Sequence, residues 1–204
     1  MDLLRQEILP ELGFKNIYFQ NGIEGDDIMA QITIQDDHTF HGFVLVANDH
    51  DLYQLLTPNT CILPGINFYT ESMFIEEYGI SPTKWGLSKA IAGCTSDNVK
   101  GVPGVGDKTA CKYIAGKMNP ETKTYEKIVD SQELIEFNKQ LVVLPHPRTK
   151  EVEIKQDSLS FRAFKDLFEE FEFKSFLDER MDEWERFVGG YDSHNPRKRR
   201  RKKR

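Results

Sequence analysis

The chain has 204 residues, 39% of them hydrophobic, and a formal net charge of −6 at pH 7. This length can bury one globular core with a smaller appendage. Three widely spaced cysteines without a C-x-x-C pair support neither a disulfide framework nor a zinc site. No apolar run approaches the length of a membrane span, and the N-terminus lacks the apolar centre of a signal peptide, so we expect a soluble intracellular protein without a membrane partner.

The charge is divided unevenly along the chain. Residues 197–204 carry +8, and subtracting this from the total of −6 leaves −14 on residues 1–196. A domain this acidic can bind a polyanion only through local basic features or through bound metal. We predict that residues 189–204 form a disordered basic tail, which tethers the chain to nucleic acid or directs it to the nucleus. The alternative is a solubilising end without a specific partner.

The first half of the chain alternates between helical and β-type patterns. Apolar spacing predicts a helix over residues 2–12, and residues 15–19 are a short β-type run. A second helix is predicted from Asp26 to about Thr33. Residues 42–47, GFVLVA, are continuously apolar, which is typical of a strand buried on both faces of a parallel sheet.

Polar residues follow this strand, at the sheet edge where catalytic groups gather in open α/β folds. Short β-type runs at residues 60–63 and 67–69 predict an edge hairpin, and helices are predicted over residues 71–78 and 82–92. The C-terminal third carries helical periodicity throughout. The predicted helices there are residues 121–130, 131–143, 160–170 and 173–188.

Between the two halves lies a glycine turn that leads into a helix, in residues 91–115. Backbone N–H groups at a helix start are unpaired and point outward, and glycine lets a phosphate backbone approach closely. Lys100, Lys108 and Lys112 add positive charge around the turn, which favours a polyanion. The sequence therefore predicts a phosphate-binding turn.

Acidic residues form three clusters: Glu24, Asp26 and Asp27; Asp49 and Asp51; and Asp97. Crowded carboxylates resist ionising together, so such clusters persist where a divalent cation cancels their charge. Two hard metal ions held by oxygen ligands are suited to hydrolysing a phosphodiester. Taken singly, each acid is by default a solvated surface residue.

The order of helix, Gly-Val-Gly turn and helix resembles the helix-hairpin-helix module of the 5′ nuclease family of flap endonucleases and 5′-to-3′ exonucleases. The family motifs in this region are Gly-Asp-x-Ser-Asp-Asn and Gly-Val-x-Gly-Ile-Gly-x-Lys-Thr-Ala. In this chain the corresponding residues 93–98 and 101–110 are GCTSDN and GVPGVGDKTA. Its Glu-Ala-Asp-Asp and Ser-x-Asp-x-Asp-Leu-x-Gln-Leu motifs are similar to residues 24–27, EGDD, and 47–55, ANDHDLYQL. The resemblance extends to about Val188.

The resemblance implies an α/β fold, with a partial PIN-like parallel sheet and helices followed by an α-helical helix-hairpin-helix domain. We expect a partial α/β nuclease domain at residues 1–92 and a DNA-binding, C-terminal helical domain at 93–188, before the tail at 189–204. The implied setting is the cytoplasm of a bacterial or phage-infected cell, with the nucleus as the alternative that the basic tail suggests.

The resemblance also assigns the acidic residues to two metal sites. The first corresponds to Glu24, Asp26 and Asp49, with Asp27 acting through water, and the second to Asp51, Asp97 and a position that holds Cys94 here. The implied catalytic residues are Asp26, Asp49 and Asp51, and the implied cofactors are Mg²⁺ or Mn²⁺, with K⁺ at the hairpin. The implied DNA-binding residues form the hairpin and the start of the next helix: Lys100, Gly101, Gly104, Val105, Gly106, Lys108, Thr109 and Lys112.

This chain departs from the family in two ways. Cys94 stands where the family has a metal-binding aspartate, and because a thiol is a poor magnesium ligand we expect a weaker second site or a shift toward Mn²⁺. Family members also carry, before the helix that matches residues 3–12, a strand with a metal-binding aspartate and an arch with a lysine and an arginine. We therefore expect a separately encoded N-terminal portion to complete the site.

The leading hypothesis is a metal-dependent 5′ nuclease that acts on DNA with a 5′ flap, a nick or a primer. The alternative is a non-catalytic DNA-binding fragment that uses the hairpin and the basic tail, which Cys94 favours. An RNA-processing nuclease stays open, since these motifs read the backbone rather than the bases. A sheet without its first strands leaves an unpaired edge, so we expect a partner or self-association.

Overall fold

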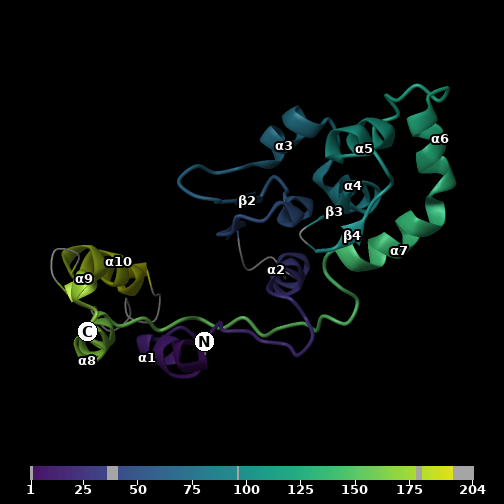
Figure 1. Ribbon diagram of the computed structural model, residues 1–204. Helices are drawn as coiled ribbons and strands as arrows, with labels where there is room; N and C mark the ends of the chain where they lie inside the picture. The colour runs from purple at the N-terminus through teal and green to yellow at the C-terminus, as the bar shows by residue number, and fades with distance from the viewer. Residues whose placement is uncertain (1, 36–40, 96, 178–180, 195–204) are drawn as a thin grey trace. The chain divides into compact units, whose positions relative to one another are not determined.

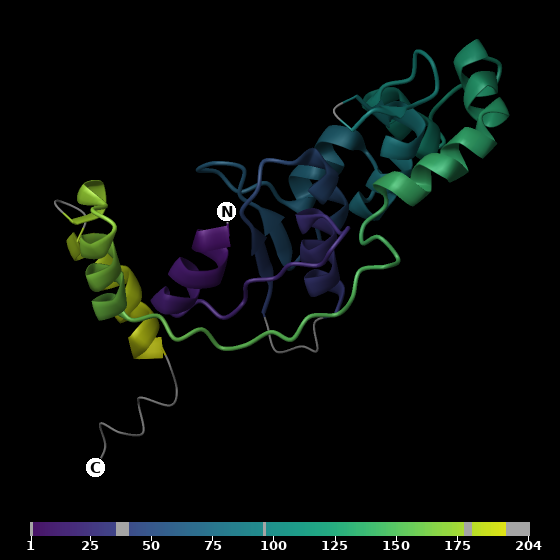
Figure 2. The same ribbon diagram turned by 60° about the horizontal axis from the view of Figure 1, so that its bottom comes forward.

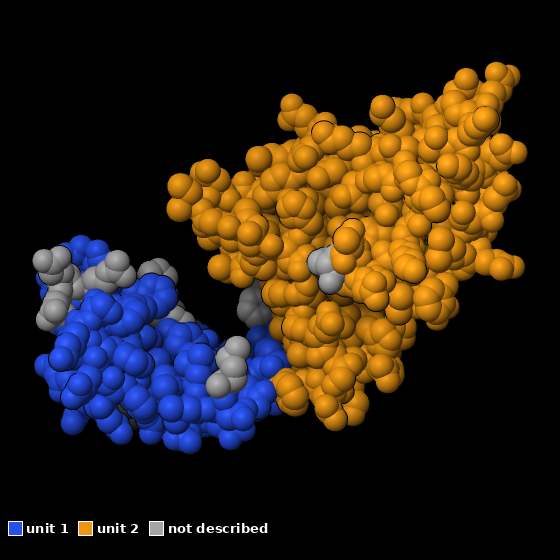
Figure 3. Space-filling view, in the orientation of Figure 1, with its two compact units in different colours: residues 1–18, 153–204 blue, residues 19–152 orange. Residues whose placement is uncertain are grey.

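The computed structural model describes residues 2–35, 41–95, 97–177 and 181–194. The chain forms two compact units, residues 1–18 with 153–204 and residues 19–152, which are coloured separately in Figure 3. The predicted domain boundary at residues 92 and 93 lies inside the second unit and stays a prediction. Among the described helices, none combines the length and the apolarity that crossing a bilayer requires.

The first unit is helical. Its elements are the π-helical η1 (Leu4–Ile8), α1 (Leu9–Leu12), α8 (Phe161–Glu170), α9 (Lys174–Leu177) and α10 (Met181–His194). The predicted helix over residues 2–12 is confirmed, and Gly13 ends it in the left-handed conformation, with φ 97°. Helix α10 reaches His194, beyond the predicted start of the tail at residue 189, and residues 195–204 lie outside the described residues.

The β-type run at residues 15–19 does not form a strand. Instead, side chains of this segment bond to the backbone of a segment far along the chain in the same unit. The Asn16 side-chain amide donates to the carbonyl oxygen of Lys155 at 2.7 Å, and the Tyr18 hydroxyl donates to that of Glu153 at 2.8 Å. The strand prediction was wrong because these side-chain bonds take the place of a backbone ladder.

The second unit holds the sheet and the remaining helices. Its elements are α2 (Gly25–Ile34), β1 (Phe43–Leu45), η2 (His50–Leu55), β2 (Thr60–Ile62), α3 (Glu71–Tyr78), η3 (Pro82–Lys84), α4 (Trp85–Ala92), β3 (Gly93–Cys94), β4 (Val99–Lys100), α5 (Asp107–Ile114), α6 (Lys123–Asp130) and α7 (Gln132–Val142). The α/β class is confirmed, as are the predicted helices at residues 71–78 and 82–92.

Strands β1 and β2 pair in parallel, with Phe43 opposite Thr60 and Leu45 opposite Ile62 (Figure 2, dark blue). The predicted edge hairpin is present as an antiparallel bridge between Ile62 and Tyr69. Burial of β1 on both faces was a wrong prediction, because Val44 is 53% exposed. Among the described residues β1 has β2 as its only neighbouring strand, so the sheet leaves one edge and part of a face uncovered.

Helix α4 is the centre of the second unit and packs against α5 and α7 (Figure 1). Trp85, at its first turn, is fully buried with Phe74 and Leu52 in one hydrophobic cluster, and Ile91, near its end, packs with Val102 in a second cluster. Burying these side chains favours folding by about 2 kcal/mol each. The loops that are predicted to form the active site therefore extend from a packed hydrophobic core.

Candidate active site

Five acidic side chains converge on one pocket of about 440 Å³ in the second unit. They come from the start of α2, from η2 and from the β3–β4 hairpin: Glu24, Asp26, Asp27, Asp51 and Asp97. The far wall of the pocket is the end of α7 and the segment that follows it, residues 140–144 and His146. Acidic residues from three separate predicted motifs thus share a cavity, although Asp49, predicted for the same site, is not among the residues that line it.

The start of α2 fixes two of these acids in different roles. Glu24 is the N-cap of the helix and forms a reciprocal capping box with Asp27, whose Oδ2 accepts the backbone N–H of Glu24 at 3.4 Å. The other oxygen of Asp27, Oδ1, accepts the backbone N–H of His146 at 2.7 Å. Both oxygens of Asp27 are therefore engaged by backbone, whereas Asp26 is partly exposed and faces the pocket.

Hydrogen bonds that involve side chains fix the conformation of the loop after β1. Asp49 caps η2, and its Oδ1 accepts the backbone N–H of Asp51 at 2.8 Å. The indole N–H of Trp85 donates to the carbonyl oxygen of His50 at 2.7 Å. The exposed His50 ring stacks on Tyr53 with ring centroids 4.8 Å apart. These bonds orient Asp51 toward the pocket.

Gln54 joins this loop to the opposite wall of the pocket. Its amide nitrogen donates to the carbonyl oxygens of Asp51 at 2.9 Å and Val142 at 3.1 Å, and its amide oxygen accepts the N–H of Leu144 at 2.9 Å. The position belongs to the Asp-Leu-Tyr-Gln-Leu motif quoted above. Its contacts give that glutamine a positioning role.

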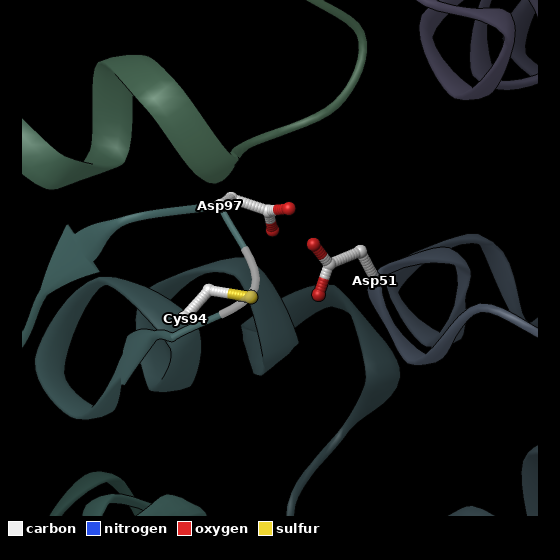
Figure 4. Close-up of side chains that lie close together, drawn as sticks. All are labelled: Asp51, Cys94 and Asp97. Carbon is white, nitrogen blue, oxygen red and sulfur yellow. The ribbon is translucent and has the colours of Figure 1, made fainter.

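A second group of donors combines Asp51 and Asp97, which line the pocket, with Cys94, which does not. Ligand atoms of Asp51, Cys94 and Asp97 all lie within 4.8 Å of one another, and Figure 4 shows the two carboxylates and the sulfur facing a common space. Cys94 comes from β3 and is 9% exposed. The β3–β4 hairpin, which carries Cys94 and Asp97, pairs Gly93 with Lys100.

The pocket is negatively charged, and this charge affects the pKa values of the carboxyl groups of Asp26 and Asp51. Burial raises the pKa of Asp26 to about 6, and the negative charge of Asp49 adds to the rise more than that of Glu24, Asp51 or Asp27. Burial also raises the pKa of Asp51, while the ammonium group of Lys89 opposes the rise. The side chains of Asp49 and Asp26 are thus close enough to repel each other.

The glycine turn borders a second pocket, of about 570 Å³, and Val99 lines both pockets. Among the predicted DNA-binding residues, this second pocket is lined by Lys100, Gly101, Gly104, Val105 and Gly106. Helix α5 begins after Gly106, which offers no side chain to cap its first N–H groups, and Lys108 and Lys112 are exposed on it. Val105 is only 5% exposed, so its side chain anchors the turn to the core.

Sequence reasoning missed two polar residues that shape the site. The buried side-chain amide of Asn138 donates to the carbonyl oxygens of Ala90 and Lys100, each at 2.9 Å, and so ties α7 to α4 and β4. Lys89 on α4 pairs with Asp51, with 3.2 Å between Nζ and Oδ1. A signal for Lys89 was present, because it is the single charged residue in the helix WGLSKAIA.

A scan against models of known protein families matches none of them. Among curated proteins, the chain is 27% identical over 198 residues to DNA polymerase I of Mycobacterium leprae, covering 81% of this chain and 22% of the relative. It is 37% identical over 94 residues to the thermostable DNA polymerase I of Thermus thermophilus, covering 46% of this chain and 11% of the relative. The chain therefore spans about a fifth or less of the length of these relatives.

Among solved structures, the zinc-bound T5 5′-exonuclease matches with a TM-score of 0.56 and 25% identity, over 63% of this chain and 52% of that chain. The bacteriophage T5 flap endonuclease solved with DNA and metal ions matches over 87% of this chain and 62% of that chain, with a TM-score of 0.56 and 19% identity. The second likeness concerns the fold alone. Together with the motifs, these matches make the chain a relative of the 5′ nuclease family.

Proposed function

We propose that the chain takes part in divalent-metal-dependent hydrolysis of phosphodiester bonds in DNA, as a 5′-to-3′ exonuclease or flap endonuclease. The observation that carries this proposal is the convergence of Asp26, Asp51 and Asp97 from three elements on one pocket. That pocket shares Val99 with the pocket of the glycine turn. A DNA backbone held at the turn would thus lie beside the carboxylates.

The donor set fits a hard divalent cation. The acidic pocket offers carboxylate oxygens, which Mg²⁺ and Mn²⁺ prefer, and the pKa of Asp26 is raised first by burial and then by the negative charge of neighbouring acids, which a cation would offset. A divalent ion bound there would offset the charge of a phosphodiester and activate water for attack on it. The T5 neighbours are described as bound to zinc or to other metal ions, which supports the same use here.

The acids have distinct roles in this proposal. Glu24, Asp26 and Asp49 would hold the first ion, and Asp27 would act through water or by positioning, since both its oxygens accept backbone N–H groups. Asp51 and Asp97 would form a second, weaker site, because the third donor, Cys94, is a thiol. In this proposal Asp26, Asp49 and Asp51 are the catalytic residues.

DNA is the proposed substrate, held through its backbone. The turn would offer backbone N–H groups at Gly104 and Gly106, with Lys100, Lys108 and Lys112 supplying positive charge and K⁺ binding at the same turn. The N–H of Thr109 instead donates to the carbonyl oxygen of Gly106 at 2.9 Å. A T5 neighbour is described as a complex with DNA, which supports this partner. Substrates with a 5′ flap, a nick or a primer all belong to the proposal.

A separately encoded N-terminal portion is part of the proposal. The chain matches only 52% of the T5 5′-exonuclease, so elements of that enzyme have no counterpart in the match. Strand β1 pairs with β2 alone among the described residues, and Val44 within it and Val46 just after it are 53% and 76% exposed. An added strand would pair with the open backbone edge and cover these side chains.

A non-catalytic DNA-binding module is the second candidate. The observation that favours it is the ion pair between Lys89 and Asp51, because an ammonium group competes with a metal ion for that carboxylate. Such a module would bind DNA through the turn and cleave nothing. If such a module still binds a metal ion at Glu24, Asp26 and Asp49, that binding would distinguish its pocket from an acidic pocket without function.

The test combines metal binding with cleavage. Calorimetric titration of the chain with Mn²⁺ should show binding that Asp26→Asn abolishes, whereas Asp130→Asn, an exposed aspartate on α6, should leave it unchanged. A 5′-flap DNA should then be cleaved in the presence of Mn²⁺, either by the chain alone or with the product of the neighbouring upstream reading frame added. Asp26→Asn should slow cleavage about 1,000-fold, as loss of several kcal/mol of charge stabilisation implies.

Each outcome decides between the candidates. Equal Mn²⁺ affinity in Asp26→Asn and Asp130→Asn would contradict the metal site. Metal binding without cleavage of flap, nicked or primer-bearing DNA in either mixture would reject the nuclease and favour the binding module.

A further inference from the structure

Lys89 is a buried cation at the edge of the acidic pocket. Its side chain is 10% exposed, and its Nζ lies 3.2 Å from Oδ1 of Asp51 and 5.6 Å from the centre of the Trp85 ring. The carboxylate that it pairs with is the one that also belongs to the donor group with Cys94 and Asp97. The ammonium group therefore occupies part of the coordination space of the weaker proposed metal site.

Anchoring η2 to α4 does not account for this lysine. The hydrogen bond from Trp85 to the carbonyl of His50 already joins the two elements, and Leu52 packs fully buried in the same hydrophobic cluster as Trp85. A buried ion pair must also repay the desolvation of both charges, so an apolar side chain would anchor the helix at least as well. The charge itself is what distinguishes Lys89.

The two donor groups differ in net charge. Counting the carboxylates and the ammonium group, Asp51 and Asp97 contribute −2 and Lys89 contributes +1, which leaves −1 beside Cys94. Glu24, Asp26 and Asp49 carry −3, and although Asp49 is not among the residues that line the pocket, its charge acts on Asp26. Because affinity for a divalent cation rises with the charge of its ligands, an ion should bind at the second group only weakly.

We propose that the ammonium group of Lys89 replaces a second divalent ion in this chain. The pocket then holds one tightly bound divalent ion, at Glu24, Asp26 and Asp49, while Lys89 provides fixed positive charge at Asp51, Cys94 and Asp97. An ammonium group offsets charge and donates hydrogen bonds, but unlike a metal ion it offers no open coordination position. This inference rests on the proposed metal-dependent function and specifies its stoichiometry.

The number of bound ions tests the inference without reference to activity. Electron paramagnetic resonance of Mn²⁺ titrated into the chain should give one tight site per molecule in the unmodified protein. The double variant Lys89→Met with Cys94→Asp restores an oxygen donor and removes the competing charge, so it should bind two ions. Lys139→Met with Cys94→Asp is the matched control, because Lys139 is a partly exposed lysine paired with Glu136, and it should still bind one.

Folding is controlled by a second variant at the same position. Lys89→Gln keeps a hydrogen-bond donor to Asp51 but removes the charge, so in combination with Cys94→Asp it should also bind two ions if circular dichroism shows the native fold. Two sites of similar affinity in the unmodified chain would overturn the inference and leave the proposed function standing. One site in both double variants would overturn it as well. No Mn²⁺ binding in the unmodified chain would instead reject the proposed function itself.

Discussion

Asp27 accepts a 2.7 Å hydrogen bond from the backbone N–H of His146, which lies 119 residues further along the chain. This bond joins the start of α2, which carries Glu24 and Asp26, to the wall of the pocket that follows α7. Asp27 is 7% exposed, so the bond is shielded from water. The geometry of the acidic pocket therefore depends on Asp27, whose two carboxylate oxygens both accept backbone N–H groups.

Replacing Asp27 by alanine should destabilise the fold. The change leaves the N–H of His146 without its acceptor and removes half of the capping box of α2, which together should lower the free energy of unfolding by about 2 to 4 kcal/mol. Urea denaturation followed by circular dichroism measures this. Asp130→Ala, on the exposed face of α6, is the control, and equal stability of the two variants would contradict the role of Asp27.

The stability of the metal-free protein should fall between about pH 4 and pH 6. The folded-state pKa of Asp26 is raised by burial to about 6, above its ordinary value of 3.8, so the folded state binds this proton more tightly than the unfolded state does. The resulting stabilisation is complete below the ordinary pKa and is lost as the pH rises through about 6. In the presence of EDTA, Asp26→Asn should raise the Tm at pH 7 and flatten this part of the pH profile. Identical profiles for the two proteins would refute the raised pKa.

Two glycines of the turn should respond differently to alanine. A Cβ at Gly101 would overlap the backbone of Ala92 and Gly93, whereas a Cβ at Gly106 would meet no other atom within 4 Å. Gly101→Ala should therefore disrupt the β3–β4 hairpin and lower the Tm. Gly106→Ala should keep the Tm but weaken DNA binding, because the methyl group would stand where the phosphate backbone approaches. Unchanged DNA affinity of Gly106→Ala would place the DNA elsewhere.

Lysines of α5 should set the salt dependence of DNA binding. Lys108 and Lys112 are exposed, and each that contacts a phosphate should contribute about 0.9 to the slope of log affinity against log salt concentration. Fluorescence anisotropy of a labelled duplex, measured across salt concentrations, should therefore show a shallower slope for each alanine variant. Lys127→Ala, an exposed lysine of α6, should keep the original slope, and a loss equal to that of Lys108→Ala would indicate nonspecific attraction.

Local signals in the sequence were sufficient for most helices. Helix α3 runs over the predicted residues 71–78 because Thr70 caps its start, accepting the N–H of Met73, and Gly79 ends it at φ 70°. The acidic convergence was also foreseeable, since the motifs that carry Asp26, Asp51 and Asp97 follow the family pattern. These features depend on residues close together in the sequence, or on a pattern of motifs.

The remaining features depend on contacts between distant segments. An apolar run such as residues 42–47 predicts a strand, but its burial depends on how many strands flank it, and Val44 is exposed because only β2 does so among the described residues. Asn138 and Lys89 find their partners 38 to 48 residues away. No local pattern specifies such pairs, although a lone lysine in an apolar helix marks a position to inspect.

The most direct test of the central claim is to soak crystals of the chain in Mn²⁺ and measure anomalous scattering near the manganese absorption edge. One strong peak should lie within coordination distance of the carboxylates of Asp26 and Asp49, and Asp26→Asn should remove it. The absence of a peak at these carboxylates in the unmodified chain, or its persistence in Asp26→Asn, would contradict the account.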